Sequence, residues 1–289
     1  MIMKKSYFYA LVSVFFWSTT TSVSKLLLHS ITTLQMMAIV FTLAMLFLFF
    51  LNLKKGNLKQ VKTYKVRDYL VLAGMGLMGM FLYRLLLFMG VARMLASQAM
   101  IVNYLWPIMT VLAGCVFLKE KLTIRKAVAV LMSFGGVIIV TTGGNITGLS
   151  GSDLLGAVYC AVSAVFYGLF VAINKRLKYD SFVSMMFYNG VSAIFAILGA
   201  LLEAEPLMLT LTHGLGLVWI GVLNTAVAFT TWNLAMKSGD TAKVANLAYM
   251  APFLSLVVAH FFLGDPITIW SVGGLLVIVA GIFLQLKDK

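Results

Sequence analysis

Long apolar blocks, separated by short polar or charged segments, run through the whole sequence. Each block holds roughly 20 predominantly apolar residues, the length that a helix needs to cross a bilayer. A backbone in lipid must satisfy its own hydrogen bonds, and the blocks show none of the alternation of a transmembrane strand. The pattern therefore predicts an all-α membrane protein with ten transmembrane helices, at residues 6–28, 32–53, 69–90, 97–118, 123–142, 153–174, 182–202, 213–235, 242–263 and 267–286.

Composition agrees with lipid as the solvent and helps to explain the charge. Of the 289 residues, 62% are hydrophobic and 11% are charged, whereas soluble domains are about a quarter charged. A net charge of +13 is also typical of proteins that bind nucleic acid. Here the basic residues lie between the apolar blocks and form no stripe interleaved with aromatic residues. We therefore expect the lipid bilayer as a partner and no nucleic acid.

The positions of the Lys and Arg residues predict the orientation of the chain. With the N-terminus in the cytoplasm, 19 of the 22 basic residues fall in cytoplasmic segments. Lys25 and Arg93 then lie outside, and Arg84 lies within a span. Such a positive-inside bias predicts that both termini are cytoplasmic. We expect a multi-pass protein of the plasma membrane (the cell inner membrane).

The two halves of the sequence repeat one another. Residues 83–141 align without a gap on 228–286, a shift of 145 residues, and the start of each half aligns with a shift of 150. We expect a single membrane domain, 1–289, with repeat one at 1–147 and repeat two at 148–289. Because each repeat has five spans, the second enters the membrane from the opposite side. Inverted repeats are typical of transporters, which bind their substrate near the midplane between the copies.

The middle of each block lacks the groups that catalysis needs. All nine Asp and Glu residues fall in loops or at block ends, and no nucleophile–base pair or metal-ligand cluster is visible within a block. We expect no enzyme, no catalytic residue, no cofactor and no metal. Proton pumps usually hold an intramembrane carboxylate, so we also expect weak or no coupling to protons. The lone His260 is interpreted as a packed or interfacial residue.

Arg84 is the charged residue that lies well inside a block. A charge within the membrane is costly and is by default a candidate functional residue. One interpretation is that Arg84 pairs with a substrate carboxylate. The other is that it snorkels, because it lies six residues from Gly90, about 9 Å along a helix, and its long side chain can reach the interface.

Aromatic and polar residues cluster at matching places in the two repeats. Trp17 and Thr20 share one face of the first helix, and Tyr167 occupies the matching face of the sixth. In the fourth helix Asn103 and Trp106 share a face. The remaining candidates by the same reasoning are Tyr83, Tyr104, Asn224, Trp232 and Tyr249. The alternative is that hydroxyl groups serve helix packing and that aromatic residues form interfacial belts.

Two prolines are candidate hinges. Pro107 follows Tyr104 in the fourth block, and Pro252 follows Tyr249 at the corresponding place in the ninth. Proline removes one hydrogen bond of a helix and frees the carbonyl four residues earlier. Such a break is tolerated in a membrane where it lines a cavity or meets another helix.

Several strings of residues resemble those of a known family. They are Phe16-Trp17-Ser18-Thr19, Val102-Asn103-Tyr104-Leu105-Trp106-Pro107, Asn174-Lys175 and Trp232-Asn233. With the repeat, they make the chain similar to the drug/metabolite transporter superfamily, in its EamA-type ten-helix branch, and within it to aromatic amino acid exporters of the YddG type. The resemblance implies cytoplasmic termini, a central cavity, alternating access and export of small metabolites, with Trp17, Tyr104, Trp106 and Trp232 at the cavity. Arg84 has no counterpart in the YddG pattern.

The pattern and the resemblance together predict a plasma-membrane transporter that exports a small-molecule substrate by alternating access through a cavity between the repeats. Amino acids with aromatic or apolar side chains are the first expectation. Export of another small metabolite or an organic cation is the alternative, and a membrane-embedded assembly factor is the alternative outside transport. Monomer and homodimer stay open. The predicted substrate-binding residues are Trp17, Thr20, Tyr83, Arg84, Asn103, Tyr104, Trp106, Tyr167, Asn224, Trp232 and Tyr249, with Pro107 and Pro252 as hinges.

Overall fold

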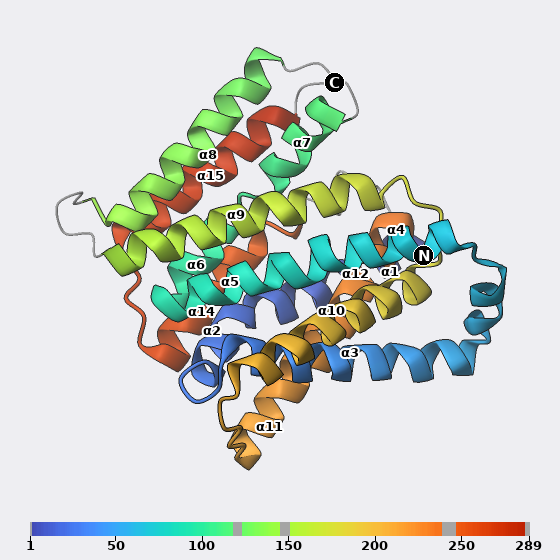
Figure 1. The fold of residues 1–289 in the computed structure, drawn as a ribbon. Coiled ribbons are helices and arrows are strands. Elements are labelled where there is room, and N and C mark those ends of the chain that lie inside the picture. The colour runs from blue at the N-terminus through green and yellow to red at the C-terminus, as the bar shows by residue number, and fades with distance from the viewer. Residues whose placement is uncertain (1, 118–122, 145–150, 239–246, 287–289) are drawn as a thin grey trace. The chain divides into compact units, whose positions relative to one another are not determined.

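A computed structural model describes residues 2–117, 123–144, 151–238 and 247–286 (Figure 1). Within these ranges the chain is helical and contains no strand. Seven of the described helical stretches are long and apolar enough to cross a membrane, and two shorter apolar helices follow near the C-terminal end. The segment 119–122 between the fourth and fifth blocks lies outside the described residues. So do most of the segment 143–152, the predicted linker between the two repeats, and the start of the ninth block.

The helices follow the predicted blocks, with some blocks divided into two or three elements. In chain order they are α1 (Ile2–Ser18), α2 (Thr20–Leu27), α3 (Thr33–Lys55), the 3₁₀ helix η1 (Asn57–Thr63), α4 (Val66–Gly76), the π-helix η2 (Leu77–Leu82), α5 (Tyr83–Arg93), α6 (Ala96–Asn103), α7 (Trp106–Phe117), α8 (Ile124–Thr142), α9 (Gly151–Asn174), α10 (Ser181–Glu203), α11 (Leu211–Val218), the π-helix η4 (Trp219–Val227), α12 (Ala228–Ser238), α14 (Met250–Leu263) and α15 (Ile269–Leu286).

The chain divides into two compact units, and each unit draws on both halves of the sequence. Unit 1 comprises Met1–Leu85 and Lys178–Ala251, and unit 2 comprises Leu86–Leu177 and Pro252–Lys289. One boundary lies inside α5, shortly after η2, and another lies immediately before Pro252. A residue of either repeat can therefore pack against residues of the other repeat within one unit.

In unit 1, α3 packs against α10 along its length. Near the end of α3 the Asn52 amide donates to the carbonyl of Phe182, at 3.0 Å. Near its start the Thr32 hydroxyl donates to the Glu203 carboxylate, at 2.6 Å. Thr32 also caps α3 through a reciprocal pair of hydrogen bonds with Gln35. Because the start of each helix lies beside the end of the other, the two helices run antiparallel.

In unit 2, α8 packs against α15, and the two helices lie side by side (Figure 1). Glycines allow the close approach. A Cβ on Gly136 would lie 2.6 Å from the carbonyl oxygen of Gly274, and a Cβ on Gly281 would lie 2.9 Å from that of Ala129. Small residues commonly let helix backbones approach in membranes. This pair is antiparallel too, since the later residue of α8 meets the earlier residue of α15.

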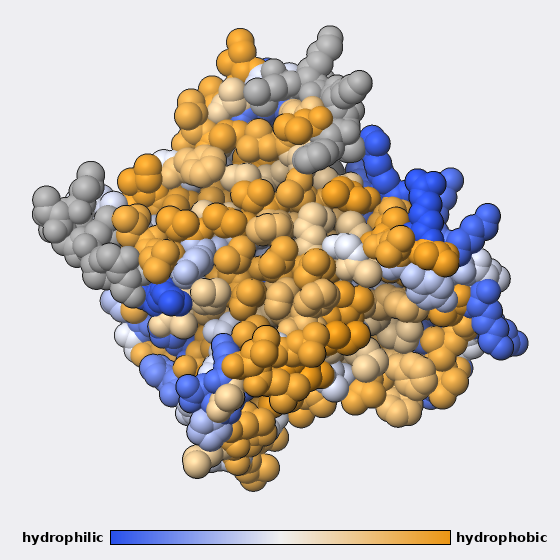
Figure 2. Space-filling view, viewed as in Figure 1, coloured by the Kyte–Doolittle hydropathy of each residue, from blue (hydrophilic) through white to orange (hydrophobic). Residues whose placement is uncertain are grey.

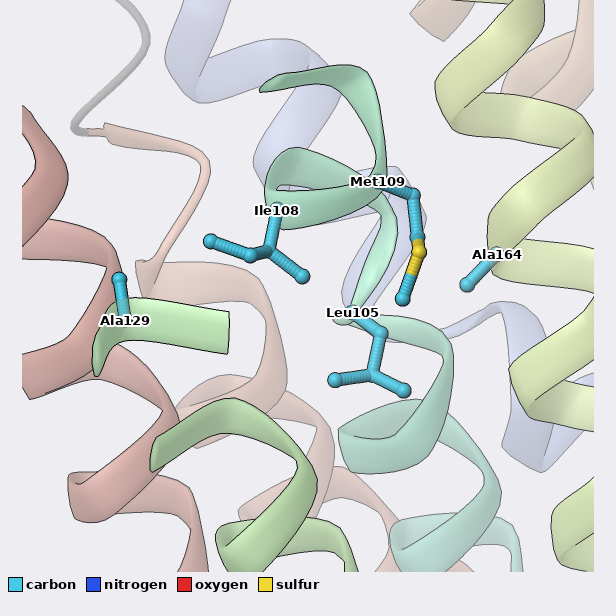
Figure 3. Close-up of a cluster of buried hydrophobic side chains, with 5 residues drawn as sticks. All are labelled: Leu105, Ile108, Met109, Ala129 and Ala164. Carbon is cyan, nitrogen blue, oxygen red and sulfur yellow. The ribbon is translucent and has the colours of Figure 1, made fainter. Parts of the chain in front are cut away.

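A buried apolar cluster joins α7 to its neighbours in unit 2. Leu105, Ile108 and Met109 lie between Ala129 of α8 and Ala164 of α9 (Figure 3). The approach of α9 is close, because a Cβ on its Gly168 would lie 2.6 Å from the Cβ of Met109. This packing fixes the start of α7, where the candidate residue Trp106 lies.

The outer surfaces of the helices are apolar. Figure 2 shows apolar side chains over most of the face in view, with hydrophilic residues gathered mainly at its edges. Large apolar residues such as Leu131, Leu202 and Phe261 are exposed. Soluble monomers rarely expose apolar patches of more than a few hundred Å², so this surface is suited to lipid.

Candidate substrate-binding residues

The first apolar block is divided at Thr19. The sequence predicts one helix over 6–28, whereas α1 ends at Ser18 and α2 begins at Thr20. The carbonyl of Phe16 accepts both the backbone N–H of Thr19, at 3.1 Å, and the Thr19 hydroxyl, at 2.7 Å. The Ser18 hydroxyl likewise donates to the carbonyl of Phe15. Hydroxyl groups that bond to the local backbone compete with the helical ladder, which accounts for the break.

Asn224 of η4 lies beside this break. It is fully buried, and its amide nitrogen donates to the carbonyl of Phe16 and to the hydroxyl of Thr20, both at 2.6 Å. Its side-chain oxygen accepts a hydrogen bond from Nη2 of Arg84 at 3.3 Å. The two donated bonds fix the orientation of the amide, so its oxygen faces the guanidinium.

Arg84 lies in the first turn of α5, directly after η2, and is 2% exposed. The centre of its guanidinium lies 5.2 Å from the ring centroid of Phe229 and 5.6 Å from that of Tyr83. The side chain therefore turns into unit 1. Snorkelling would require it to extend along α5 towards Gly90, which it does not. Whether the guanidinium contacts substrate stays a prediction.

Aromatic rings pack against the same place. The Trp17 ring centroid lies 5.2 Å from that of Phe229 and 5.1 Å from that of Trp232. Trp17 is 8% exposed, and its Nε1 is buried without a hydrogen-bond acceptor among the described residues. We name the group formed by Trp17, Thr20, Arg84, Asn224, Phe229 and Trp232 the Arg84 cluster.

Unit 1 thus brings together six of the eleven candidates: Trp17, Thr20, Tyr83, Arg84, Asn224 and Trp232. Tyr249 belongs to the same unit and is buried just before α14. Sequence analysis missed Phe229, whose ring contacts both Trp17 and Arg84. The repeat alignment carried a signal for it, because Phe229 is the counterpart of Arg84 at the shift of 145 residues.

The other four candidates lie in unit 2, around the break between α6 and α7. Ser163 donates a hydrogen bond to the Asn103 side-chain oxygen at 3.2 Å. The Trp106 ring lies edge-on to Tyr167, with centroids 5.2 Å apart, and 6.2 Å from Tyr104. We name Asn103, Tyr104, Trp106 and Tyr167 the Trp106 cluster.

Both candidate hinges follow a helix break. Pro107 is the second residue of α7, and Pro252 lies in the first turn of α14. Proline is tolerated at the start of a helix because the N–H groups there have no partner within the helix. Pro252 is also the first residue of unit 2 after the chain leaves unit 1. A role as hinges stays a prediction for both.

Residues 54–67 join the second and third predicted spans, and in unit 1 the titratable residue Tyr179 lies against Tyr64 of this loop, with ring centroids 5.5 Å apart. The hydroxyl of Tyr179, between α9 and α10, donates to the Asp68 carboxylate at 2.8 Å. Burial, followed by this hydrogen bond, raises the pKa of Tyr179 above its ordinary value. Among the described residues no group of three His, Cys, Asp or Glu side chains could hold a metal.

Comparison with known proteins identifies the family. The model of the EamA-like transporter family matches the chain in two segments, 4–142 and 154–286. The chain belongs to the EamA-like transporter family. It is therefore a multi-pass membrane transporter of a small molecule and not an enzyme. The gap between the matched segments falls on the predicted linker between the repeats.

Individual relatives of this EamA-like protein are distant. A transporter of Clostridium kluyveri, described as uncharacterized, is 28% identical over 99% of this chain and 94% of its own. The aromatic amino acid exporter YddG of Ancylobacter novellus is 28% identical over 64% of this chain and 66% of its own. A crystal structure of a protein with 20% identity has a TM-score of 0.71 and covers 98% of this chain and 96% of the other, which shows a shared fold.

Proposed function

We propose that this transporter exports amino acids with aromatic or apolar side chains from the cytoplasm, by alternating access. The Arg84 cluster carries the proposal, because it holds both kinds of group that such a substrate needs. The rings of Trp17, Phe229 and Trp232 suit an apolar side chain. Arg84, Asn224 and Thr20 suit the polar end. The exporter of Ancylobacter novellus, named for aromatic amino acids, favours the same substrate class.

Reciprocal contacts support ten transmembrane helices arranged as two inverted five-helix repeats in one membrane domain. A two-fold axis that exchanges the repeats must turn every contact into its counterpart. At the shift of 145, the contact of Gly136 with Gly274 becomes that of Gly281 with Ala129, and both occur. At the shift of 150, Asn52 corresponds to residue 202 and Phe182 to residue 32, so the bond between Asn52 and Phe182 predicts a contact between residues 202 and 32. The observed bond joins Thr32 to Glu203, one residue from that position.

The orientation proposed for this domain places both ends of the chain in the cytoplasm, in the plasma membrane. The support is the excess of Lys and Arg in the segments that would face the cytoplasm. Reporter fusions test it. We expect a cytoplasmic signal from fusions at Lys289 and in the 54–67 loop, and an outside signal from the 143–152 linker. An outside signal from the 54–67 loop would overturn the assignment.

Counterflow in proteoliposomes tests the substrate. Vesicles that contain the purified protein and unlabelled tryptophan should take up labelled tryptophan or phenylalanine faster than vesicles without protein. Trp17→Ala should slow this exchange roughly tenfold or more, because it removes a large ring from the site. Phe15→Ala is the matched control, since Phe15 lies two residues away in α1 and is 54% exposed. Exchange of organic amines without exchange of any amino acid would contradict the proposal.

An organic cation, the main alternative, fits the Arg84 cluster less well. Aromatic rings can hold a quaternary or primary ammonium group through cation–π attraction. The guanidinium of Arg84, however, already lies 5.2 Å from the Phe229 ring. A second positive charge beside it would be repelled, and more strongly in a dry site than in water.

A further inference from the structure

The contact between Arg84 and Phe229 joins a residue to its own repeat counterpart. At the shift of 145, residue 84 becomes 229 and residue 229 becomes 84. A contact that maps onto itself can occur only beside the two-fold axis that relates the proposed repeats. Both residues follow a π-helix, since η2 ends at Leu82 and η4 ends at Val227. The Arg84 cluster therefore lies beside the axis of the proposed symmetry, and inverted-repeat transporters bind their substrates at the interface of the two repeats.

The two repeats differ in polarity at the Arg84 cluster. Arg84 corresponds to Phe229, and Thr20 corresponds to Phe170 at the shift of 150. Asn224 corresponds to Gly79 when the first alignment is extended by four residues. The chain is also divided at Thr19, whereas α9 is continuous at the corresponding position. Each polar member of the cluster thus has an apolar or glycine counterpart, so one repeat supplies a cation where the other supplies an aromatic ring.

We infer that Arg84 binds the carboxylate of the substrate, and that the carboxylate, not the ammonium group, is what this site requires. The inference rests on the proposed function and names its substrate class more closely. The class is a carboxylate attached to an aromatic or apolar body, with or without an amine.

The geometry of the cluster gives this assignment its chemistry. A guanidinium presents a planar fork of N–H donors that matches the two oxygens of a carboxylate. Asn224 holds one arm of the fork through Nη2, at 3.3 Å. The Trp17 ring lies edge-on to the Phe229 ring, whose centroid is 5.2 Å from the Arg84 guanidinium. Trp17 Nε1 is a buried donor without an acceptor among the described residues. A ligand oxygen would satisfy that donor, which otherwise costs stability.

The positive charge of Arg84 also explains why an amine is not needed. The ammonium group of an amino acid would enter a site whose buried charge has the same sign. All nine acidic residues of the chain fall in loops or at block ends, and the nearest to Arg84 in sequence is Asp68. The ammonium group therefore gains little here, whereas the carboxylate gains a charge-assisted pair.

Three indole probes separate the two ends of the substrate: tryptophan, indole-3-propionate, which lacks the amine, and tryptamine, which lacks the carboxylate. Affinities are measured by thermal shift of the purified full chain. The wild type should bind the first two within a few-fold of each other and tryptamine at least tenfold more weakly. Arg84→Gln keeps hydrogen-bond donors but removes the charge, so binding of both carboxylates should fall roughly 10- to 100-fold. Binding of tryptamine should not fall and should strengthen, because its ammonium group is no longer repelled by Arg84.

A second variant covers the case in which Arg84→Gln does not fold. Asn224→Asp keeps the shape of the side chain and places a carboxylate of the protein beside Arg84. It loses the hydrogen bond to the Phe16 carbonyl, whereas the Thr20 hydroxyl can donate to the new carboxylate. It should compete with the substrate and produce the same loss for carboxylates alone. Arg93→Gln is the matched control, because Arg93 lies at the far end of the same α5 helix and bonds to the carbonyl of Met89.

The outcomes distinguish this inference from the proposed function. If the ratio of carboxylate to amine affinity is unchanged in both variants, Arg84 does not bind the carboxylate, although tryptophan counterflow by the wild type would still support export of amino acids. If indole-3-propionate binds at least tenfold more weakly than tryptophan, the amine is required and the inference is wrong. If the wild type prefers tryptamine and exchanges no amino acid, both proposals fall.

Discussion

Asn224 sets the geometry of the Arg84 cluster because every polar atom of its side chain has a defined partner. Its nitrogen bonds to the Phe16 carbonyl and the Thr20 hydroxyl, and its oxygen bonds to Arg84. Neither an apolar side chain nor a charged one could both donate the two hydrogen bonds and accept the third. The residue therefore acts as a positioning residue, which couples the break in the first span to the buried cation.

Substitution of Trp106 tests whether the Trp106 cluster selects aromatic substrates. Trp106→Ala removes the ring that packs edge-on against Tyr167. We expect the affinity for tryptophan and phenylalanine to fall by roughly 1–3 kcal/mol, the value of burying a large ring, and the affinity for alanine to stay unchanged. Competition in the counterflow assay measures both.

Trp270→Ala is the control for that substitution. Trp270 lies in the same unit but is 47% exposed, so its loss should leave both affinities unaltered. An equal loss of affinity for aromatic and small substrates in Trp106→Ala would instead show that Trp106 supports the fold of unit 2 without selecting substrate.

The elements that carry the Arg84 cluster depart from regular α-helix. The π-helix η2 spans Leu77–Leu82 and η4 spans Trp219–Val227, and a shift of 145 residues places the first within the second. A π-helical turn holds extra residues and is frequent at functional sites. It changes the direction in which the following residues point, and Arg84 and Phe229 each follow such a turn, with the guanidinium centre 5.2 Å from the Phe229 ring centroid.

The apolar blocks and their approximate ends could be predicted from the sequence, because a bilayer demands one length and one polarity. The π-helices could not, since Leu77–Leu82 has the composition of any apolar helix. The break at Thr19 was also hidden, because it depends on hydroxyls bonding to carbonyls at Phe15 and Phe16. For the candidate site, residue types suggested which side chains to consider. Their grouping needed contacts across some 200 residues, of which the repeat alignment could indicate only the pair of Arg84 and Phe229.

The close crossing of α8 and α15 leaves little room for a side chain at Gly274. Gly274→Ala places a Cβ 2.6 Å from the carbonyl oxygen of Gly136 and against Val140. Either α8 or α15 must then shift, and overpacking of this kind costs about 1–3 kcal/mol. We expect a lower midpoint of thermal unfolding in detergent.

Gly273→Ala is the matched control for Gly274→Ala. It lies next in the same helix, and a Cβ there meets no heavy atom within 4 Å. Since alanine favours helix by about 1 kcal/mol over glycine, this variant should be as stable as the wild type or more so. Equal destabilisation by both substitutions would mean that the crossing of α8 and α15 does not limit stability.

The contacts of Asp265 and His260 bear on whether transport by the molecule is coupled to protons. Asp265, in the turn before α15, is 7% exposed and accepts hydrogen bonds from the backbone N–H and the hydroxyl of Ser97. A ring nitrogen of His260 lies 3.0 Å from the Asp265 carbonyl. These contacts cap the start of α6 and fix a turn, which are structural tasks for both residues.

We therefore expect transport that does not depend on a proton gradient. Counterflow should proceed at equal pH on both sides of the vesicle membrane, with a rate that an imposed gradient leaves nearly unchanged. His260→Ala should alter neither result. Strong uphill accumulation driven by a pH gradient, and its loss in His260→Ala, would show that the transporter is coupled to protons through this residue.

A helix surface that packs against its own repeat counterpart is self-complementary. The pairs α3 with α10 and α8 with α15 both have this property in the proposed repeat, so two separate copies of one five-helix chain, inserted in opposite directions, would make the same contacts. Gene duplication followed by fusion is the simplest history for such a chain. The covalent link then serves stoichiometry more than structure, and we expect residues 1–147 and 148–289, produced as two polypeptides in one cell, to assemble into a working transporter.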